Sequence, residues 1–450
     1  MITVIVPFCL LLAIILIRKI PYIGGNIQIA LLLTGLVALV MGGVYNPIDW
    51  LWAWVDGIDR IAWVLALAVF GSIYAETQVR MGTMDTVINL LRAKFGHSSR
   101  GMVICIILAL VLAGSLLGDS VAAATVIGVL IVRSLAELNL DEIHIAAIII
   151  MGAELGSIMP PVTQSVFLSA SLVNVDPDAV VNVAYFTVGG AVILTCLYVA
   201  FLFVKTKSLP EDLIPKEKAM SILKKDWMTL IPLTVLIVLV VLRTGFNIDL
   251  VTMAIGPLLN MLSGVKILKG LSNLIVASII IVTLLSFCHP KVYKQGWDVL
   301  KTGLKNVKTS IGISCSCGLM LGAFYAAGQI EAVKEFALRL NASVLKLGGS
   351  AALTLLGMLT GSQSTAQNTI FSFFGPALVE IGVDPIHAAI GGSHVAVAGQ
   401  VMPPACIIAF VVCSLVGGIL NKKVDPVKTM IYCTPMAIYF LVIGVAFFFI

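Results

Sequence analysis

Residues 156–167 read "GSIMPPVTQSVF" and residues 399–410 read "GQVMPPACIIAF", so two consecutive prolines interrupt two otherwise apolar stretches in the same way. Proline removes a backbone N–H group and clashes with the preceding helical turn. Each proline pair should therefore end one helix and let another begin after it. The sequence predicts two broken helices, over residues 143–172 and 386–419.

The composition of the chain is that of a membrane protein. Of its 450 residues, 60% are hydrophobic and 11% are charged, with a mean hydropathy of +1.08, whereas soluble domains carry about 25% charged residues. Backbone groups that face lipid must form their hydrogen bonds within the segment, so we predict an all-α integral membrane fold. The net charge of +5 is carried by loops, which marks membrane topology and excludes a nucleic-acid surface.

The chain contains an internal duplication. The two Pro-Pro pairs lie 243 positions apart (404 − 161), and the same shift aligns about a third of the fifty or so residues before them. The matched pairs include Leu112 with Leu355, Gly114 with Gly357, Gly118 with Gly361, His144 with His387, and Gly156 with Gly399. Self-similarity at a fixed shift indicates two copies of one structural unit.

We divide the chain into a first repeat at 1–204, a polar linker at 205–227, a second repeat at 228–427 and a C-terminal helix at 428–450. Each repeat is expected to hold two spanning helices, an amphipathic stretch (44–60 and 289–307), a further helix, a re-entrant hairpin and a broken helix.

The two hairpins are predicted over 102–132 and 343–379. The first is interrupted by "AGSLLGDS" at 113–120, where a continuous helix would bury Asp119 in lipid at a cost of about 2.5 kcal/mol or more. The second is interrupted by "TGSQSTAQNT" at 360–369. Two half-length helices that meet at a polar tip avoid this cost if the tip lines an aqueous cavity.

The distribution of basic residues predicts the topology. An outside N-terminus places Arg80, Arg92, Lys94 and the linker inside, as the positive-inside rule prefers. Five crossings in the first half then start the second half on the opposite side, which makes the repeats inverted. This scheme requires segment 249–262 to be re-entrant or interfacial.

The breaks and tips together predict a binding site. The prolines should leave carbonyls of 156–160 and 399–403 without intrahelical partners, and such oxygens suit Na⁺. The restarting helices present positive N-terminal ends that can hold a carboxylate. The candidate cation-binding residues are Gly118, Asp119, Ser120, Gly156, Pro160, Gly361, Ser362, Gly399 and Pro403. The candidate substrate-binding residues are Thr163, Gln164, Ser165, Ser364, Thr365 and Asn368. We expect no cofactor, with Na⁺ as the coupling ion.

Each candidate also has a purely structural interpretation. A single Pro-Pro kink is usually a packing feature, and "GSLLG" at 114–118 has the spacing of a helix-packing motif. Asp119 could cap the second helix of the first hairpin. Glu154 could be a coupling carboxylate or the partner of His394 or of another buried polar group. We expect His144 and His387 to have structural roles at the starts of their helices.

The motifs "GDSVAAATVIG" (118–128), "GSIMPPVTQSVF" and "GVDPIHAAIGG" (382–392) resemble the large membrane subunit of tripartite ATP-independent periplasmic (TRAP) transporters. The resemblance implies an elevator-type fold and Na⁺-driven import of organic acids across the cell inner membrane. It also implies two partners, a small four-helix membrane subunit and a soluble substrate-binding protein.

The sequence departs from this family at the first hairpin tip. The family tip usually reads Gly-Ser-Ser-Val-Ala-Asp, whereas residues 118–123 read Gly-Asp-Ser-Val-Ala-Ala. A stand-alone dicarboxylate carrier of the same superfamily, coupled to Na⁺ or H⁺, is therefore the alternative. A membrane-embedded enzyme is disfavoured, because the chain has no HExxH stretch and no glycine two residues before Asp119.

Overall fold

The structure is a computed structural model that describes residues 2–17, 21–95, 98–205, 217–246 and 248–450. Within these ranges the chain forms helices and connecting turns and no strand, so the predicted all-helical fold is confirmed. By length and hydropathy, five described helices could cross a membrane, or six if the bent helix α15 (Gly296–Ala326) counts as one span. These five are α4 (Ala62–Met81), α6 (Ser99–Leu117), α10 (Pro177–Leu202), α17 (Ala342–Thr360) and α22 (Pro426–Phe447).

The remaining helices are shorter or more polar. In the first half they are α1 (Ile2–Leu16), α2 (Ile27–Met41), α3 (Pro47–Arg60), α5 (Thr83–Phe95), α7 (Ser120–Glu137), α8 (Glu142–Ile158) and α9 (Gln164–Leu172). In the second half they are α11 (Ala219–Phe246), α12 (Leu250–Ser263), η2 (Leu268–Ser272), α13 (Leu274–Phe287), α14 (Pro290–Tyr293), α16 (Gln329–Arg339), α18 (Gln363–Ala366), the π-helical turn η3 (Gln367–Phe371), α19 (Ser372–Glu380), α20 (Pro385–Val401) and α21 (Ile407–Leu420).

Aspartate caps set where the helices around the breaks begin. The Asp141 carboxylate accepts the His144 N–H at 2.8 Å before α8, and Asp384 accepts the N–H groups of Ile386 and His387 before α20. Such caps satisfy N–H groups that have no partner within the helix. His144 and His387 therefore lie at helix starts, as the sequence indicates.

Both proline pairs end a helix. Helix α8 ends at Ile158 and α20 at Val401, and in each case the following methionine is extended. The chain restarts as α9 at Gln164 and as α21 at Ile407. Both Pro-Pro peptide bonds are cis.

Each hairpin turns at a glycine and packs against the broken helix of its own repeat. Gly118 and Gly361 end α6 and α17 with φ of 64° and 63°, a left-handed conformation that glycine adopts without strain. A Cβ atom on Gly114 would lie 2.6 Å from the Cα atom of Gly156, and one on Gly357 would lie 2.9 Å from the Cα atom of Gly399. The same small-residue contact therefore holds the hairpin to the broken helix in both halves.

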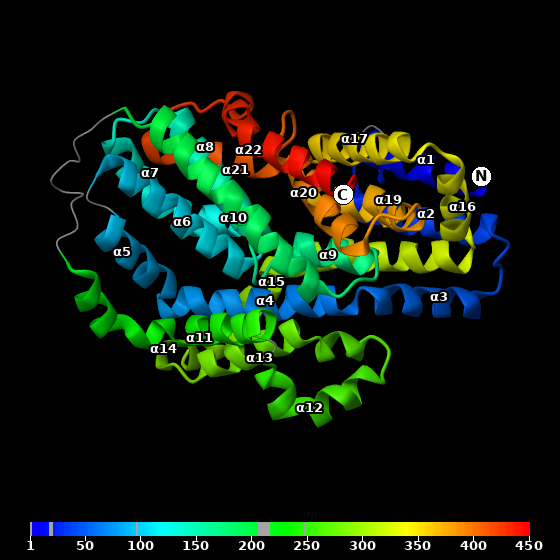
Figure 1. Cartoon of the computed structure of the whole chain (residues 1–450), viewed down its shortest axis with the longest axis horizontal. Helices are drawn as coiled ribbons and strands as arrows, with labels where there is room; N and C mark the ends of the chain where they lie inside the picture. Colours follow the sequence, from blue (N-terminus) through cyan, green and yellow to red (C-terminus); the bar gives the residue numbers. More distant parts are fainter. Residues whose placement is uncertain (1, 18–20, 96–97, 206–216, 247) are drawn as a thin grey trace.

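The two halves also share their wider packing. Helix α2 packs on α15 and α13 packs on α4, so each half supplies a helix that covers the long helix of the other half. Figure 1 shows α4 running through the middle of the molecule, with α11 and α13 along one side of it. The first hairpin (α6 and α7) lies toward one end of the molecule and α17 toward the other.

Residues 206–216, half of the predicted linker, lie outside the described residues, and α11 already begins at Ala219 within the stretch assigned to that linker. Segment 249–262 forms α12, whose 14 residues span about 21 Å, less than the roughly 30 Å of a hydrocarbon core. The turn after α12 is bound to α3, since Lys266 pairs with Asp56 and Lys269 with Asp59.

The glycine contact makes a prediction about stability. Gly114→Ala should lower the free energy of unfolding by about 1–3 kcal/mol, because the added methyl group forces α6 away from α8. Thermal unfolding in detergent measures this change. Gly348→Ala is the control, since no atom lies within 4 Å of the added methyl group. Equal stability of the two variants would contradict a tight α6–α8 contact.

Candidate functional site

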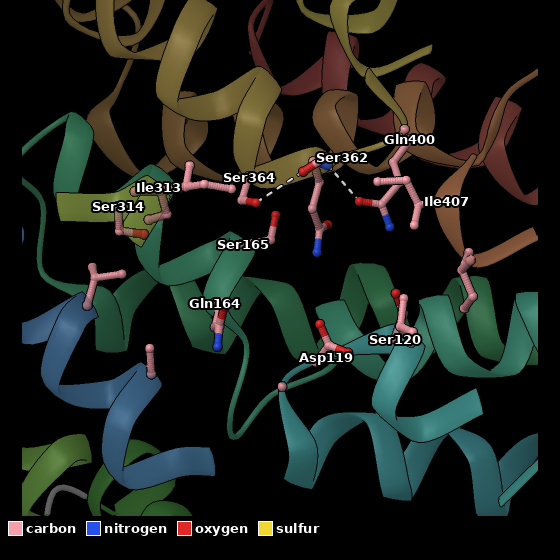
Figure 2. Close-up of a pocket in the computed structure, with 18 residues that line it drawn as sticks. Asp119, Ser120, Gln164, Ser165, Ile313, Ser314, Ser362, Ser364, Gln400 and Ile407 are labelled. Atoms are coloured by element: carbon pink, nitrogen blue, oxygen red, sulfur yellow. Dashed lines mark hydrogen bonds between the residues drawn. The ribbon is translucent and has the colours of Figure 1, made fainter. Parts of the chain in front are cut away.

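A cavity of about 210 Å³ lies where the hairpin tips and helix breaks of the two halves meet. Figure 2 shows residues from both repeats around it. Its wall comprises Val64, Ala68, Gly118, Asp119, Ser120, Val121, Gln164, Ser165, Leu168, Ile313, Ser314, Gly361, Ser362, Gln363, Ser364, Gln400, Ile407 and Ile408. Segments almost 250 residues apart in the chain therefore build one site, as the sequence analysis expected of the breaks and tips.

The first hairpin tip contributes the only charge among the described residues that line this cavity, the carboxylate of Asp119. One Asp119 oxygen accepts the Ala122 N–H at 2.6 Å and so caps α7. The side chain is nevertheless exposed to the cavity. The capping interpretation is therefore correct, and it leaves this carboxylate in position to meet a cation.

Asp119 and Gln164 also line a second, smaller cavity of about 90 Å³. The wall of this cavity includes Glu76 and Asn306. Glu76 pairs with the partly exposed Arg80 at 2.7 Å. Asp119 and Gln164 thus lie between the central cavity and a polar region of α4 and α15.

The second hairpin tip is neutral and rich in hydroxyl groups. Ser362 caps α18 through the Thr365 N–H at 3.3 Å, and its hydroxyl oxygen lies 3.2 Å from that of Ser364. Ser362 and Ser364 both line the cavity. The two tips therefore differ in charge although they occupy matched positions in the repeats.

The backbone oxygens at the breaks are less free than expected. The Gly156 carbonyl accepts the Met159 N–H at 3.1 Å, and the Gly399 carbonyl accepts the Met402 N–H at 3.2 Å. The expectation that these two carbonyls lack intrahelical partners was wrong, because the last turn tightens to i→i+3 bonding before the prolines. Gly156, Pro160, Gly399 and Pro403 do not line the central cavity.

Three of the six predicted substrate residues, Gln164, Ser165 and Ser364, line the cavity. The other three, Thr163, Thr365 and Asn368, are fully buried behind its wall. They sit at capping or inner positions of their helices; for example, the Thr163 hydroxyl faces the Val166 N–H at 3.5 Å.

The sequence analysis missed three glutamines. Gln363 and Gln400 line the cavity, and Gln367 joins the halves by donating to the Ser165 carbonyl and the Ser169 hydroxyl, both at 2.7 Å. All three lie in or beside the quoted motifs. Their side-chain amides can both donate and accept hydrogen bonds, so they can join groups of either kind.

Glu154 is hydrogen-bonded to other buried polar groups and not to His394. Its Oε1 atom accepts hydrogen bonds from Gln400 at 2.5 Å and from Ser120 at 3.2 Å. His394 instead lies 2.9 Å from the Thr187 hydroxyl and 3.1 Å from the Ser393 hydroxyl. The partnership between Glu154 and His394 is therefore not formed.

Helix ends supply the remaining electrostatics. Ser120, Gln164 and Ile407, the first residues of α7, α9 and α21, all line the cavity. The N-terminal ends of helices carry partial positive charge and unpaired N–H groups. The cavity therefore combines one carboxylate with several positive helix ends, an arrangement that can hold a cation and an anion side by side.

A polar cavity walled by interrupted helices inside an all-helical membrane fold is the architecture of a transporter. The chain belongs to the family of the DctM component of tripartite ATP-independent periplasmic transporters, whose sequence model matches residues 8–450. It is therefore a component of a secondary transport system with partner components, and not an enzyme.

Other comparisons bear on the fold alone. The chain resembles the crystal structure of the YdaH transporter of Alcanivorax borkumensis, which is described as having an unusual topology, at 13% sequence identity and a TM-score of 0.58. The similarity covers 87% of this chain and 85% of that one. No curated protein matches the sequence.

The cavity wall can be tested by chemical labelling. A cysteine at position 364 should react with a small hydrophilic thiol reagent at least about tenfold faster than one at position 365, because only the former side chain reaches the cavity. The unsubstituted protein gives the background from its own cysteines. Equal rates for Ser364→Cys and Thr365→Cys would contradict this wall.

Proposed function

We propose that the chain is the large permease of a TRAP-type system that imports a small organic acid anion, a carboxylate or dicarboxylate, using an inward Na⁺ gradient. The observation that carries this proposal is the shared cavity, where one carboxylate and several positive helix ends meet. Its partners would be the small membrane subunit and the soluble binding protein of such systems. The complex would lie in the cell inner membrane.

The cation would bind first. Asp119 is the only charged residue among the described cavity residues, and none of them is basic. An organic anion that entered alone would meet the negative charge of Asp119, and two negative charges held close together repel each other. Na⁺ held by Gly118, Asp119 and Ser120 removes this repulsion, so the acid binds after it.

The second tip would hold a further cation or the acid itself. Gly361 and Ser362 present backbone and hydroxyl oxygens of the kind that bind Na⁺. The break residues Gly156, Pro160, Gly399 and Pro403 do not line the cavity, so they would contribute backbone oxygens only after a rearrangement. Gln164, Ser165 and Ser364 would contact the acid directly. Thr163, Thr365 and Asn368 would contribute only after a rearrangement, because they are buried behind the wall.

Movement would follow the elevator scheme. The hairpins and broken helices pack together, α6 on α8 and α17 on α20, whereas α2, α4, α13 and α15 pack on one another. The first group would carry the site and the second would form the fixed support. Ile313 and Ser314 of α15 and Val64 of α4 line one side of the cavity, so movement would expose the site by taking it past these residues.

Uptake into proteoliposomes tests the proposal. Labelled four-carbon dicarboxylates and sugar acids should enter in an inward Na⁺ gradient when a binding protein and a small membrane subunit are supplied. Gradient-driven uptake by the chain alone would instead favour a stand-alone carrier. Uptake that is independent of Na⁺ under both conditions would contradict the proposed coupling.

Asp119 gives the sharpest variant. Asp119→Ala should raise the Na⁺ concentration needed for half-maximal uptake by at least about tenfold, which corresponds to about 1.4 kcal/mol of cation-binding free energy. Glu137→Ala is the matched control, because Glu137 is an exposed carboxylate at the other end of α7. An unchanged Na⁺ dependence in Asp119→Ala would remove this residue from the cation site.

A further inference from the structure

A chain of three hydrogen bonds connects the two hairpin tips through the protein interior. Ser120 of the first tip donates to Glu154 Oε1 at 3.2 Å, and Gln400 Nε2 donates to the same oxygen at 2.5 Å. Gln400 Oε1 in turn accepts the backbone N–H of Gln363, in the second tip, at 2.6 Å. Figure 2 shows Ser120 and Gln400 on the cavity wall, with a dashed line for the hydrogen bond that the Gln400 side chain accepts.

The middle of this chain is shielded from solvent. Glu154 is fully buried and Gln400 is 7% exposed. Glu154 Oε2 has no hydrogen-bond partner among the described residues, so Oε1 carries all the polar contacts of the carboxyl group. Removing a partner from a buried network leaves other groups unsatisfied, which makes such a chain cooperative.

This chain of hydrogen bonds, from Ser120 through Glu154 and Gln400 to Gln363, is called the bridge below, and it does not follow the internal symmetry. The 243-residue shift places Val397 opposite Glu154 and Ser157 opposite Gln400. Val397 cannot hydrogen-bond through its side chain, and the Ser157 hydroxyl donates to the backbone carbonyl of Glu154. The hydrogen-bonded connection between the two tips is therefore asymmetric, and duplication alone did not produce it.

We propose that Glu154 and Gln400 are positioning residues that couple the two tips, so that a cation at the first tip orders the second. The hydrogen bonds stand by themselves, but their consequence, the linkage of cation binding to acid binding, rests on the proposed function. Ser120 can donate its proton to Glu154 while its lone pairs face a cation. Binding at Ser120 then fixes Glu154, Gln400 and the Gln363 backbone in turn.

Hydrogen–deuterium exchange of the full chain tests the bridge without any ligand. Glu154→Leu removes the shared acceptor and should raise exchange at the second tip, residues 361–366, by about tenfold. Gln400→Met should likewise raise exchange at the first tip, residues 118–123. Glu154→Gln retains an acceptor and should leave both tips near wild type. Val397→Ala, a truncation at the repeat-equivalent position, is the control.

Two results would overturn the inference. One is unchanged exchange at the distant tip in both Glu154→Leu and Gln400→Met. The other is an equal rise in Val397→Ala, which would indicate general loosening. If Glu154→Leu fails to fold, Gln400→Met and Glu154→Gln still decide the question.

The second measurement is the effect of Na⁺ on the apparent affinity for the acid during transport. In wild type, saturating Na⁺ should tighten the apparent acid affinity by about tenfold or more, a typical coupling factor between sites. Gln400→Met should reduce this factor to about one, whereas a purely structural role would lower the maximal rate and leave the factor intact. If exchange rises in the variants but the wild-type protein transports nothing, the proposed function is contradicted and the coupling of the two tips is supported. If the wild-type protein transports normally but exchange is unchanged in the variants, the coupling of the two tips is contradicted and the proposed function is supported.

Discussion

The constraint on which the structure depends is that a backbone polar group inside a membrane must have a partner. Continuous helices meet it along most of the chain, and interrupted helices meet it only where protein or a polar cavity surrounds the interruption. The described part of the chain contains interruptions at Gly118, Pro160, Gly361 and Pro403. They are tolerable because they gather around a single cavity, where the exposed helix ends find polar surroundings.

Duplication explains how four interruptions come to share one place. The close contacts of Gly114 with Gly156 and of Gly357 with Gly399 fix each tip beside its own break. Packing between the halves then brings the two pairs together. The halves keep the same backbone plan but differ in side chains, since Asp119 lies in one tip and Ser362 in the other. In the function we propose, this difference would let one site hold a cation and an anion.

Much of this arrangement was predictable because short stretches of sequence determine it. Proline pairs, positive-φ glycines and aspartate caps act within a few residues, so the breaks, the hairpin turns and the helix starts follow from short motifs. Contacts between the halves were not predictable in the same way. Gln400 and Gln367 become important only when the fold places them beside Glu154 and Ser165. Nor could local reasoning foresee that Thr163 and Thr365 turn away from the cavity.

Anomalous scattering from crystals grown with thallium, a strongly scattering monovalent ion, would locate the bound cations. We expect density at the first tip beside Asp119 and Ser120, with a second position near Gly361 and Ser362. Loss of the first position in Asp119→Ala would accompany it. Density only at the protein surface, with none at either tip, would contradict the claim that the paired breaks and tips form a cation-coupled site.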